Sequence, residues 1–276
     1  MADDGTYVTI AGVRRTSGIA STEINDDDVS AIISECEPQV ERFFNTSFTP
    51  KERIDILDGD GTVRIFTDKN PLLSVKELKI DGDSVDIDDL LISKESGKIQ
   101  LNTTAATSTF KAKPKAIAIK YLYGMVQESS TETITSTAST TGNDISLTAT
   151  DITGFSQNDW VEIYSMDGNK EVAQINAAPS GNTIQVDQLV LSHESGSKLV
   201  KLQTSEIFKK LINIACAIAM VARIVGQSYT DTVGYGLGEL NVQKGEPYTQ
   251  WRETATQLTK ERDRIISTLK PRPCIR

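Results

Sequence analysis

In "YLYGMVQESSTETITSTASTTGNDISL", residues 121–147, an alternating apolar segment ends at Gly124 and a long Ser/Thr-rich tract follows. Two interpretations are open. Either the tract links two domains end to end, or it is the entry to a domain that has been inserted into another. The flanking sequence decides between them, because an inserted domain leaves its host with two segments that need each other.

The segment before residue 121 begins with a helix and continues with strands. Residues 25–44 carry apolar side chains at the three-and-four spacing of an amphipathic helix, with Asn25 or Asp26 as its cap and a kink or break expected at Pro38. Short alternating runs follow, which predict a small antiparallel sheet. These runs are "RIDIL" and "TVRIF" around the turn "DGDG" (58–61), "PLLSVKELKIDGDSVD" turning at 81–83, "GKIQL", and "KAIAIKYLY" (115–123).

The segment after the Ser/Thr tract is again rich in strands and then becomes helical. Its alternating runs are "DISLTA", "DWVEIYS", "KEVAQINA" and "NTIQVD". Residues 205–225 predict a helix that is apolar over much of its circumference, so we expect it to be buried on several sides. A last helix is predicted over 248–269, and the two prolines of "KPRPCIR" predict an extended tail over 270–276.

Composition limits the function classes. The net charge of −9 divides into −6 over 1–125, −7 over 126–204 and +4 over 205–276, and an acidic chain is a poor candidate for gripping nucleic acid. Three widely spaced cysteines argue against a disulfide framework, and Cys36 and Cys216 fit small core residues. No apolar stretch reaches the roughly 18–20 residues of a membrane span, and the acidic N-terminus does not resemble a secretory signal.

The order of these elements resembles the head–tail connector, or adaptor, proteins of tailed viruses. The resemblance rests on Gly61–Phe66, Pro71–Val75, Tyr121–Gly124 and the helix that opens at Ser205. In that family the "Y-x-x-G" strand runs almost directly into the next helix, whereas here residues 125–204 intervene. The tract is therefore better interpreted as the entry to an insertion.

The predicted fold class is α+β: a helical adaptor core with a small antiparallel sheet, and an inserted all-β barrel or sandwich domain. We expect 1–125 and 205–276 to form the discontinuous core, and 126–204 to form the inserted domain. Residues 270–276 form the tail.

The sequence predicts no enzyme, and no catalytic, cofactor or metal site. The single histidine, His193, lies in a turn-rich loop without a "G-x-S-x-G" elbow, and Ser197 breaks the "H-E-x-x-H" zinc pattern. The acidic turns do not have calcium-loop spacing. The cluster "GYGLG" (234–238) is not a phosphate-binding fingerprint. Trp160 is interpreted as a core residue rather than a sugar-stacking platform.

The resemblance implies a structural protein of the virion neck, made in the host cytoplasm. It would form a ring of about twelve subunits between portal and tail, with a channel that the genomic DNA touches only transiently and non-specifically. The expected partners are copies of the chain, the portal protein and a downstream neck or tail protein, with no membrane. The ring core is predicted on the helix from 205, at Phe208, Leu211, Ile214, Ile218 and Val221. Portal docking is predicted at Lys270, Arg272, Pro273 and Arg276. The alternative is a ligand- or host-glycan-binding module carried by the β-insert on a structural scaffold.

Overall fold

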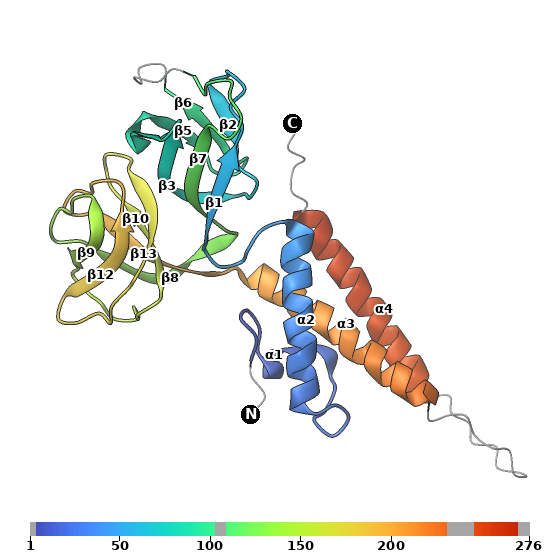
Figure 1. Cartoon of the computed structure of the whole chain (residues 1–276). Coiled ribbons are helices and arrows are strands. Elements are labelled where there is room, and N and C mark those ends of the chain that lie inside the picture. The colour runs from blue at the N-terminus through green and yellow to red at the C-terminus, as the bar shows by residue number, and fades with distance from the viewer. Residues whose placement is uncertain (1–3, 103–108, 231–245, 270–276) are drawn as a thin grey trace, which may run out of the picture. The chain divides into compact units, whose positions relative to one another are not determined.

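The structure, a computed structural model, describes residues 4–102, 109–230 and 246–269, and it divides into two compact units (Figure 1). The helical unit comprises Met1–Phe44 and Glu206–Arg276, and the β unit comprises Asn45–Ser205. The predicted α+β class with antiparallel sheets is confirmed. The sequence analysis groups residues 45–125 with the helices, whereas the structure groups residues 45–125 and 126–204 in one compact unit.

Four helices form the helical unit: α1 (Ile10–Ser17), α2 (Asp26–Phe44), α3 (Glu206–Thr230) and α4 (Glu246–Leu269). The apolar α3 packs against each of the other three, which explains why apolar residues cover so much of its circumference. Asn25 caps α2 by accepting a hydrogen bond from the Asp28 amide over 2.8 Å. The helix runs through Pro38, so the alternative of a break at that residue is wrong.

A buried carboxylate holds the N-terminal segment on α2. Glu37 is 6% exposed and accepts hydrogen bonds from the amides of Thr6, Tyr7 and Val8 at 2.8–3.2 Å. These amides lie next to the start of α1 and have no helical partner of their own. Glu37 thus replaces missing backbone acceptors.

The first half of the β unit, residues 45–125, is called the first β module. Its four-stranded antiparallel sheet has the order β1 (Lys51–Leu57), β7 (Ile117–Tyr123), β3 (Leu72–Ile80) and β4 (Asp83–Val85). A second, three-stranded sheet has the order β2 (Arg64–Phe66), β6 (Lys98–Leu101) and β5 (Leu90–Ser93), and it shares one hydrophobic core with the first sheet. The short 3-10 helix η1 (Ile87–Asp89) leads into β5. The predicted pair that turns at 81–83 is confirmed as β3–β4.

The predicted hairpin at 58–61 is wrong. Strand β1 pairs with β7, whereas β2 pairs with β6 in the other sheet. The turn instead pairs with residues 110–113, where Gly59 and Lys113 exchange backbone hydrogen bonds of 3.0 and 3.2 Å. Gly59 is needed there because a Cβ at this position would lie 1.8 Å from the Lys111 carbonyl oxygen. The turn residues were identified, but their partner was not.

Residues 126–204 are called the second β module. A four-stranded sheet of order β11 (Lys170–Gln174), β10 (Trp160–Tyr164), β13 (Lys198–Thr204) and β8 (Val126–Ile134) shares a core with the pair β12 (Thr183–Leu189) and β9 (Gly142–Thr148). Among the described residues no sheet closes on itself, so the barrel is not confirmed. The first part of the Ser/Thr tract is strand β8, with outward polar side chains.

The two ends of the second β module lie side by side. Val126 pairs with Thr204 and Gln127 with Gln203, because β8 and β13 run antiparallel. The Thr204 hydroxyl also donates to the Phe48 carbonyl over 3.0 Å. A segment with adjacent ends can occupy one connection of a host chain without separating the flanking residues.

Candidate functional site

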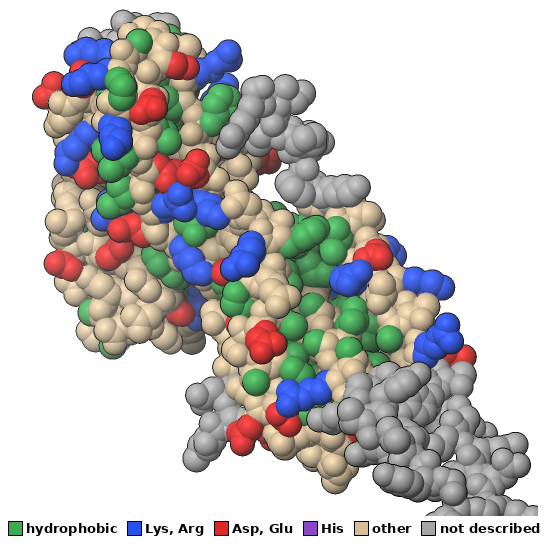
Figure 2. Space-filling view, turned by 45° about the vertical axis from the view of Figure 1, so that its right-hand side comes forward, with side chains coloured by type: hydrophobic (Ala, Val, Ile, Leu, Met, Phe, Trp, Pro, Cys, Tyr) green, Lys and Arg blue, Asp and Glu red, His purple; other side chains and the backbone are tan. Residues whose placement is uncertain are grey.

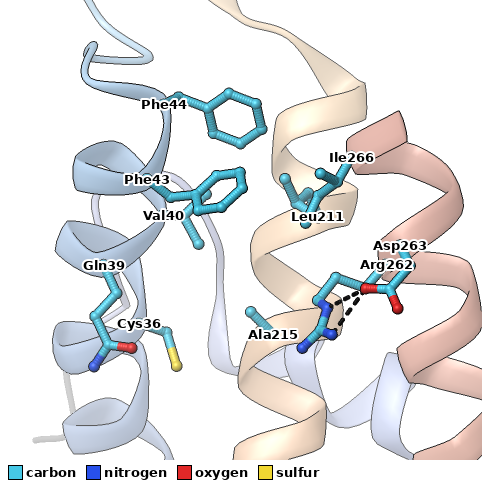
Figure 3. A pocket seen from close by; sticks show the side chains of 10 residues that line it. All are labelled: Cys36, Gln39, Val40, Phe43, Phe44, Leu211, Ala215, Arg262, Asp263 and Ile266. Carbon is cyan, nitrogen blue, oxygen red and sulfur yellow. Dashed lines mark hydrogen bonds and ion pairs between the residues drawn. The ribbon is translucent and has the colours of Figure 1, made fainter. Parts of the chain in front are cut away.

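The principal candidate site is an apolar groove on the helical unit, of about 440 Å³. Helix α2 forms one wall, α3 the floor and α4 the opposite wall (Figure 3). The lining residues are Cys36, Gln39, Val40, Phe43 and Phe44 from α2, Leu211 and Ala215 from α3, and Arg262, Asp263 and Ile266 from α4. We call this surface the docking groove.

Two adjacent phenylalanines show why the groove is open. Phe44 is 8% exposed and packs edge-to-face against Phe208, with ring centroids 5.5 Å apart. Phe43 points in a different direction from the helix axis and remains 65% exposed, although its ring centroid lies 5.1 Å from that of Phe44. Consecutive helical residues point about 100° apart, so a "Phe-Phe" pair cannot face one core. That spacing is a sequence signal for a second apolar surface, which the sequence analysis missed.

Charged side chains line the α4 wall and its surroundings. Arg262 pairs with its neighbour Asp263 at 2.8 Å. The preceding residue, Glu261, accepts hydrogen bonds from Arg264 and Lys210, and these bonds lower the pKa of Glu261 to about 2. Lys210 belongs to α3, so this ion pair also ties the floor to the wall. The groove therefore combines an apolar interior with paired charges at one edge, as protein interfaces do.

The predicted ring-core residues are mostly internal to one chain. Phe208, Leu211, Ile214 and Val221 are each at most 3% exposed, and Ile218 is half-buried. These residues therefore belong to the core of the helical unit. Of the five, Leu211 also lines the docking groove. The predicted docking residues Lys270, Arg272, Pro273 and Arg276 lie outside the described residues, as does "GYGLG".

His193 belongs to a buried hydrogen-bond network in the β unit. Its Nδ1 lies 2.6 Å from Ser165 Oγ and its Nε2 lies 2.9 Å from Glu171 Oε1. The order serine–imidazole–carboxylate is that of a catalytic triad. However, the imidazole and the carboxylate are each only 1% exposed, and Ser165 Oγ also contacts Ser197 Oγ at 2.9 Å. A substrate cannot reach this imidazole, so the network is structural.

A second, polar depression lies on the second β module. It is lined by Glu132, Thr133, Ile134, Thr150, Asp151, Gly196 and Lys198, with no aromatic side chain among them. Trp160 is half-buried against Leu122, Val172 and Leu202. A stacking platform for sugars is thus absent from this depression.

The described residues contain no group of three or more His, Cys, Asp or Glu side chains that could hold a metal ion. Within the same residues, no helix has the length and apolar character needed to cross a membrane.

Comparisons with known proteins give little. No known protein family and no curated protein matches the chain. Among solved structures, the Gp54 tailspike of Acinetobacter baumannii bacteriophage AP22, in complex with A. baumannii capsular saccharide, matches with 16% sequence identity and a TM-score of 0.23. The match covers 29% of this chain and 15% of the tailspike chain. A likeness this partial carries no argument about function.

Proposed function

We propose that the chain is a structural subunit of the neck of a tailed virus, which forms a ring between portal and tail by packing the docking groove against a neighbouring copy. The observation that carries the proposal is the groove itself. Phe43 is 65% exposed beside Val40, Ala215 and Ile266, at a site of about 440 Å³. A concave apolar surface with an exposed aromatic ring is the kind of surface at which proteins bind one another.

The surface character of the helical unit supports this proposal. Hydrophobic side chains gather on the helices in the view of Figure 2. Aromatic side chains at the centre of a patch, with charges at its edge, are the usual composition of a protein interface. The net charge of −9 also suits a channel wall that must let DNA pass, because it repels phosphate weakly.

The proposal is tested by comparing Phe43→Asp with Ile56→Asp. Both side chains are 65% exposed, but Phe43 lies in the docking groove and Ile56 lies on β1 of the β unit. Assembly would be followed by mass photometry of the chain alone and by co-sedimentation with portal rings encoded by the same virus. We expect the unchanged chain and Ile56→Asp to form rings, alone or on the portal, and Phe43→Asp to remain monomeric.

Two outcomes would contradict the proposal. If Phe43→Asp assembles as well as the unchanged chain, the groove is not the subunit contact. If the unchanged chain stays monomeric and does not sediment with portal rings, the chain is not a neck subunit. A variant ending at Leu269, tested beside these, separates docking through the C-terminal tail from assembly through the groove.

A further inference from the structure

Lys76 and Glu171 form an ion pair in the interior of the β unit. The Lys76 side chain is 2% exposed and that of Glu171 is 1% exposed, and Lys76 Nζ lies 3.7 Å from Glu171 Oε2. Of the lysines in the described part of the chain, Lys76 is the one that is buried. Taking two charges out of water is costly, and at a separation longer than a hydrogen bond their attraction offsets only part of that cost. Stability alone is therefore a weak explanation for this pair.

The surroundings of Lys76 favour the neutral form of its amine. Nζ donates a hydrogen bond to the Gln188 carbonyl oxygen over 3.0 Å. Burial lowers the pKa of the Lys76 amine, although the charges of Glu171 and Asp187 act in the opposite direction. An amine without its extra proton has a free electron pair, and a buried lysine of this kind can act as a nucleophile. Lys76 thus combines a nearby carboxyl group with a reduced tendency to hold its proton.

The surroundings of Glu171 suit a carboxyl group that is attacked by a nucleophile. The Val190 amide donates to Oε2 and the Leu191 amide donates to Oε1, each over 3.0 Å. Backbone amides aimed at carboxyl oxygens stabilise the negative charge that develops when a nucleophile adds to the carbon between them. His193 Nε2 lies 2.9 Å from Oε1, which is within reach for proton transfer. No outside substrate reaches this imidazole, but here both reacting groups already lie inside the fold.

We propose that Lys76 and Glu171 are a modification site, at which the two side chains condense to an amide that covalently joins the two β modules. One proton of the Lys76 ammonium passes to Glu171 Oε1, and Nζ then attacks Cδ while an electron pair moves onto Oε2. The doubly protonated imidazole of His193 donates its Nε2 proton to Oε1, the Cδ–Oε1 bond breaks, and Oε1 leaves as water. The second proton of Nζ restores the imidazole. Nζ loses two protons and Oε1 gains two, so the reaction consumes no other reactant.

Two physical effects favour the amide over the ion pair. The reaction replaces two buried charges by one neutral group, which removes the desolvation cost of the pair. The fold also holds the amine beside the carboxyl group, so little translational or rotational entropy is lost when the bond forms. Because side chains that are at most 2% exposed exclude water, hydrolysis of the product is disfavoured.

A second contact between a lysine and a carboxylate of the two modules provides the comparison. Lys94 Nζ lies 3.6 Å from Glu162 Oε1, nearly the same separation, but the Lys94 side chain is 34% exposed. Glu162 also pairs with Lys170 at 3.0 Å. The single histidine of the sequence contacts Glu171 and is therefore not available to Glu162. We expect the amide bond at Lys76 and Glu171 and not at Lys94 and Glu162.

The test is the mass of the full chain, measured after the folded protein has been purified and then denatured. We expect the chain to be lighter than its sequence by one water molecule, and we expect digestion to give one branched peptide pair that links positions 76 and 171. The control is Lys76→Met/Glu171→Gln, which removes both buried charges together and leaves neither of them unpaired. This variant should have the full mass of its own sequence. It should also migrate more slowly in a denaturing gel, because no cross-link closes the loop of residues 77–170.

A further variant, His193→Gln, tests the proton carrier. We expect most of its molecules to retain the full sequence mass, and circular dichroism confirms that both variants are folded. The inference is overturned if the folded, unchanged chain keeps its full sequence mass after prolonged incubation, or if water is lost without a branch between positions 76 and 171. A branch between positions 94 and 162 would likewise overturn it. If His193→Gln forms the bond as fast as the unchanged chain, the role given to His193 is wrong. None of these outcomes depends on ring formation, so the proposed function is tested separately.

Discussion

Glu171 Oε1 lies 2.9 Å from His193 Nε2, and Glu171 Oε2 lies 3.7 Å from Lys76 Nζ. The Glu171 side chain is 1% exposed. Lys76 belongs to β3 in the first β module, whereas Glu171 and His193 belong to the second. The Val190 and Leu191 amides also donate to the carboxylate at 3.0 Å each. One buried carboxylate thus joins the two β modules, beside the apolar cluster of Leu122, Val172 and Leu202.

We predict that Glu171→Gln destabilises the β unit by about 3–5 kcal/mol, because Lys76 is left as a buried charge without its counter-ion. Glu132→Gln is the control. The ion pair of Glu132 with Lys198 is shorter, at 2.7 Å, but both of its side chains are about half exposed. Its loss should cost less than about 1 kcal/mol. Urea unfolding of both variants measures the difference, and equal costs would show that Glu171 does not join the modules.

The adjacent pair Phe43 and Phe44 gives a second prediction, for stability rather than assembly. Phe44→Ala removes a buried ring that packs on Phe208 and should cost about 3–5 kcal/mol. Phe43→Ala removes a mostly exposed ring and should change the free energy of unfolding by about 0.5 kcal/mol or less. Unfolding is measured at a concentration where the chain is monomeric. A large loss from Phe43→Ala would mean that Phe43 belongs to the core and not to an interface.

Much of the fold was predictable, and the failures have physical causes. Helices α2, α3 and α4 follow from apolar periodicity, and β3, β4 and β7 from alternation with a turn. Helix α1 was missed because it has only eight residues, and its N-terminal segment depends on Glu37, thirty residues later. The partner of β1 was misassigned because local turn chemistry does not reveal that Gly59 meets the 110–113 backbone.

The site was less predictable than the fold. Apolar residues on α3 were expected to face other subunits, but the chain covers most of them itself. Phe43 stays exposed instead, because it lies on a side of α2 that does not pack against α3. The hydrogen-bond network of His193 was not predictable because it depends on Glu171, a charged residue at a buried strand position. Such a residue indicates a buried network only once its partners are known.

Acid sensitivity gives a third prediction, centred on Asp55. Burial raises the pKa of this carboxyl, but hydrogen bonds from Tyr121 at 2.6 Å and Arg53 at 2.5 Å outweigh it, so the pKa lies below its ordinary value of 3.8. A carboxyl with a lowered pKa in the folded state stabilises the fold above pH 3.8, and that stability is lost as pH falls through the folded-state pKa.

Tyr121→Phe removes a hydroxyl that donates to Asp55 Oδ2 and accepts from the Lys69 amide. It should cost about 1–3 kcal/mol at neutral pH, because the buried carboxylate loses one of its donors and the amide loses its acceptor. It should also move the acid-induced loss of stability to higher pH. Urea midpoints measured at several pH values between neutrality and the acid transition test both effects. Tyr123→Phe, on the same strand, is the control. An unchanged pH profile in Tyr121→Phe would show that the hydroxyl does not set the ionisation of Asp55.

Substitutions at two glycines distinguish the cost of a steric clash from the cost of an unfavourable backbone conformation. Gly59→Ala would place a Cβ 1.8 Å from the Lys111 carbonyl oxygen, so two backbone segments must move apart. We expect this substitution to cost about 3 kcal/mol, as overpacking against backbone does. Gly168→Ala meets nothing within 4 Å, but its φ of +95° is unfavourable for a residue with a Cβ. A cost of about 1–2 kcal/mol is expected for that left-handed conformation. Thermal unfolding of the two variants ranks the effects. If Gly168→Ala is the more harmful, the close approach of Gly59 to the Lys111 carbonyl is not what the turn requires.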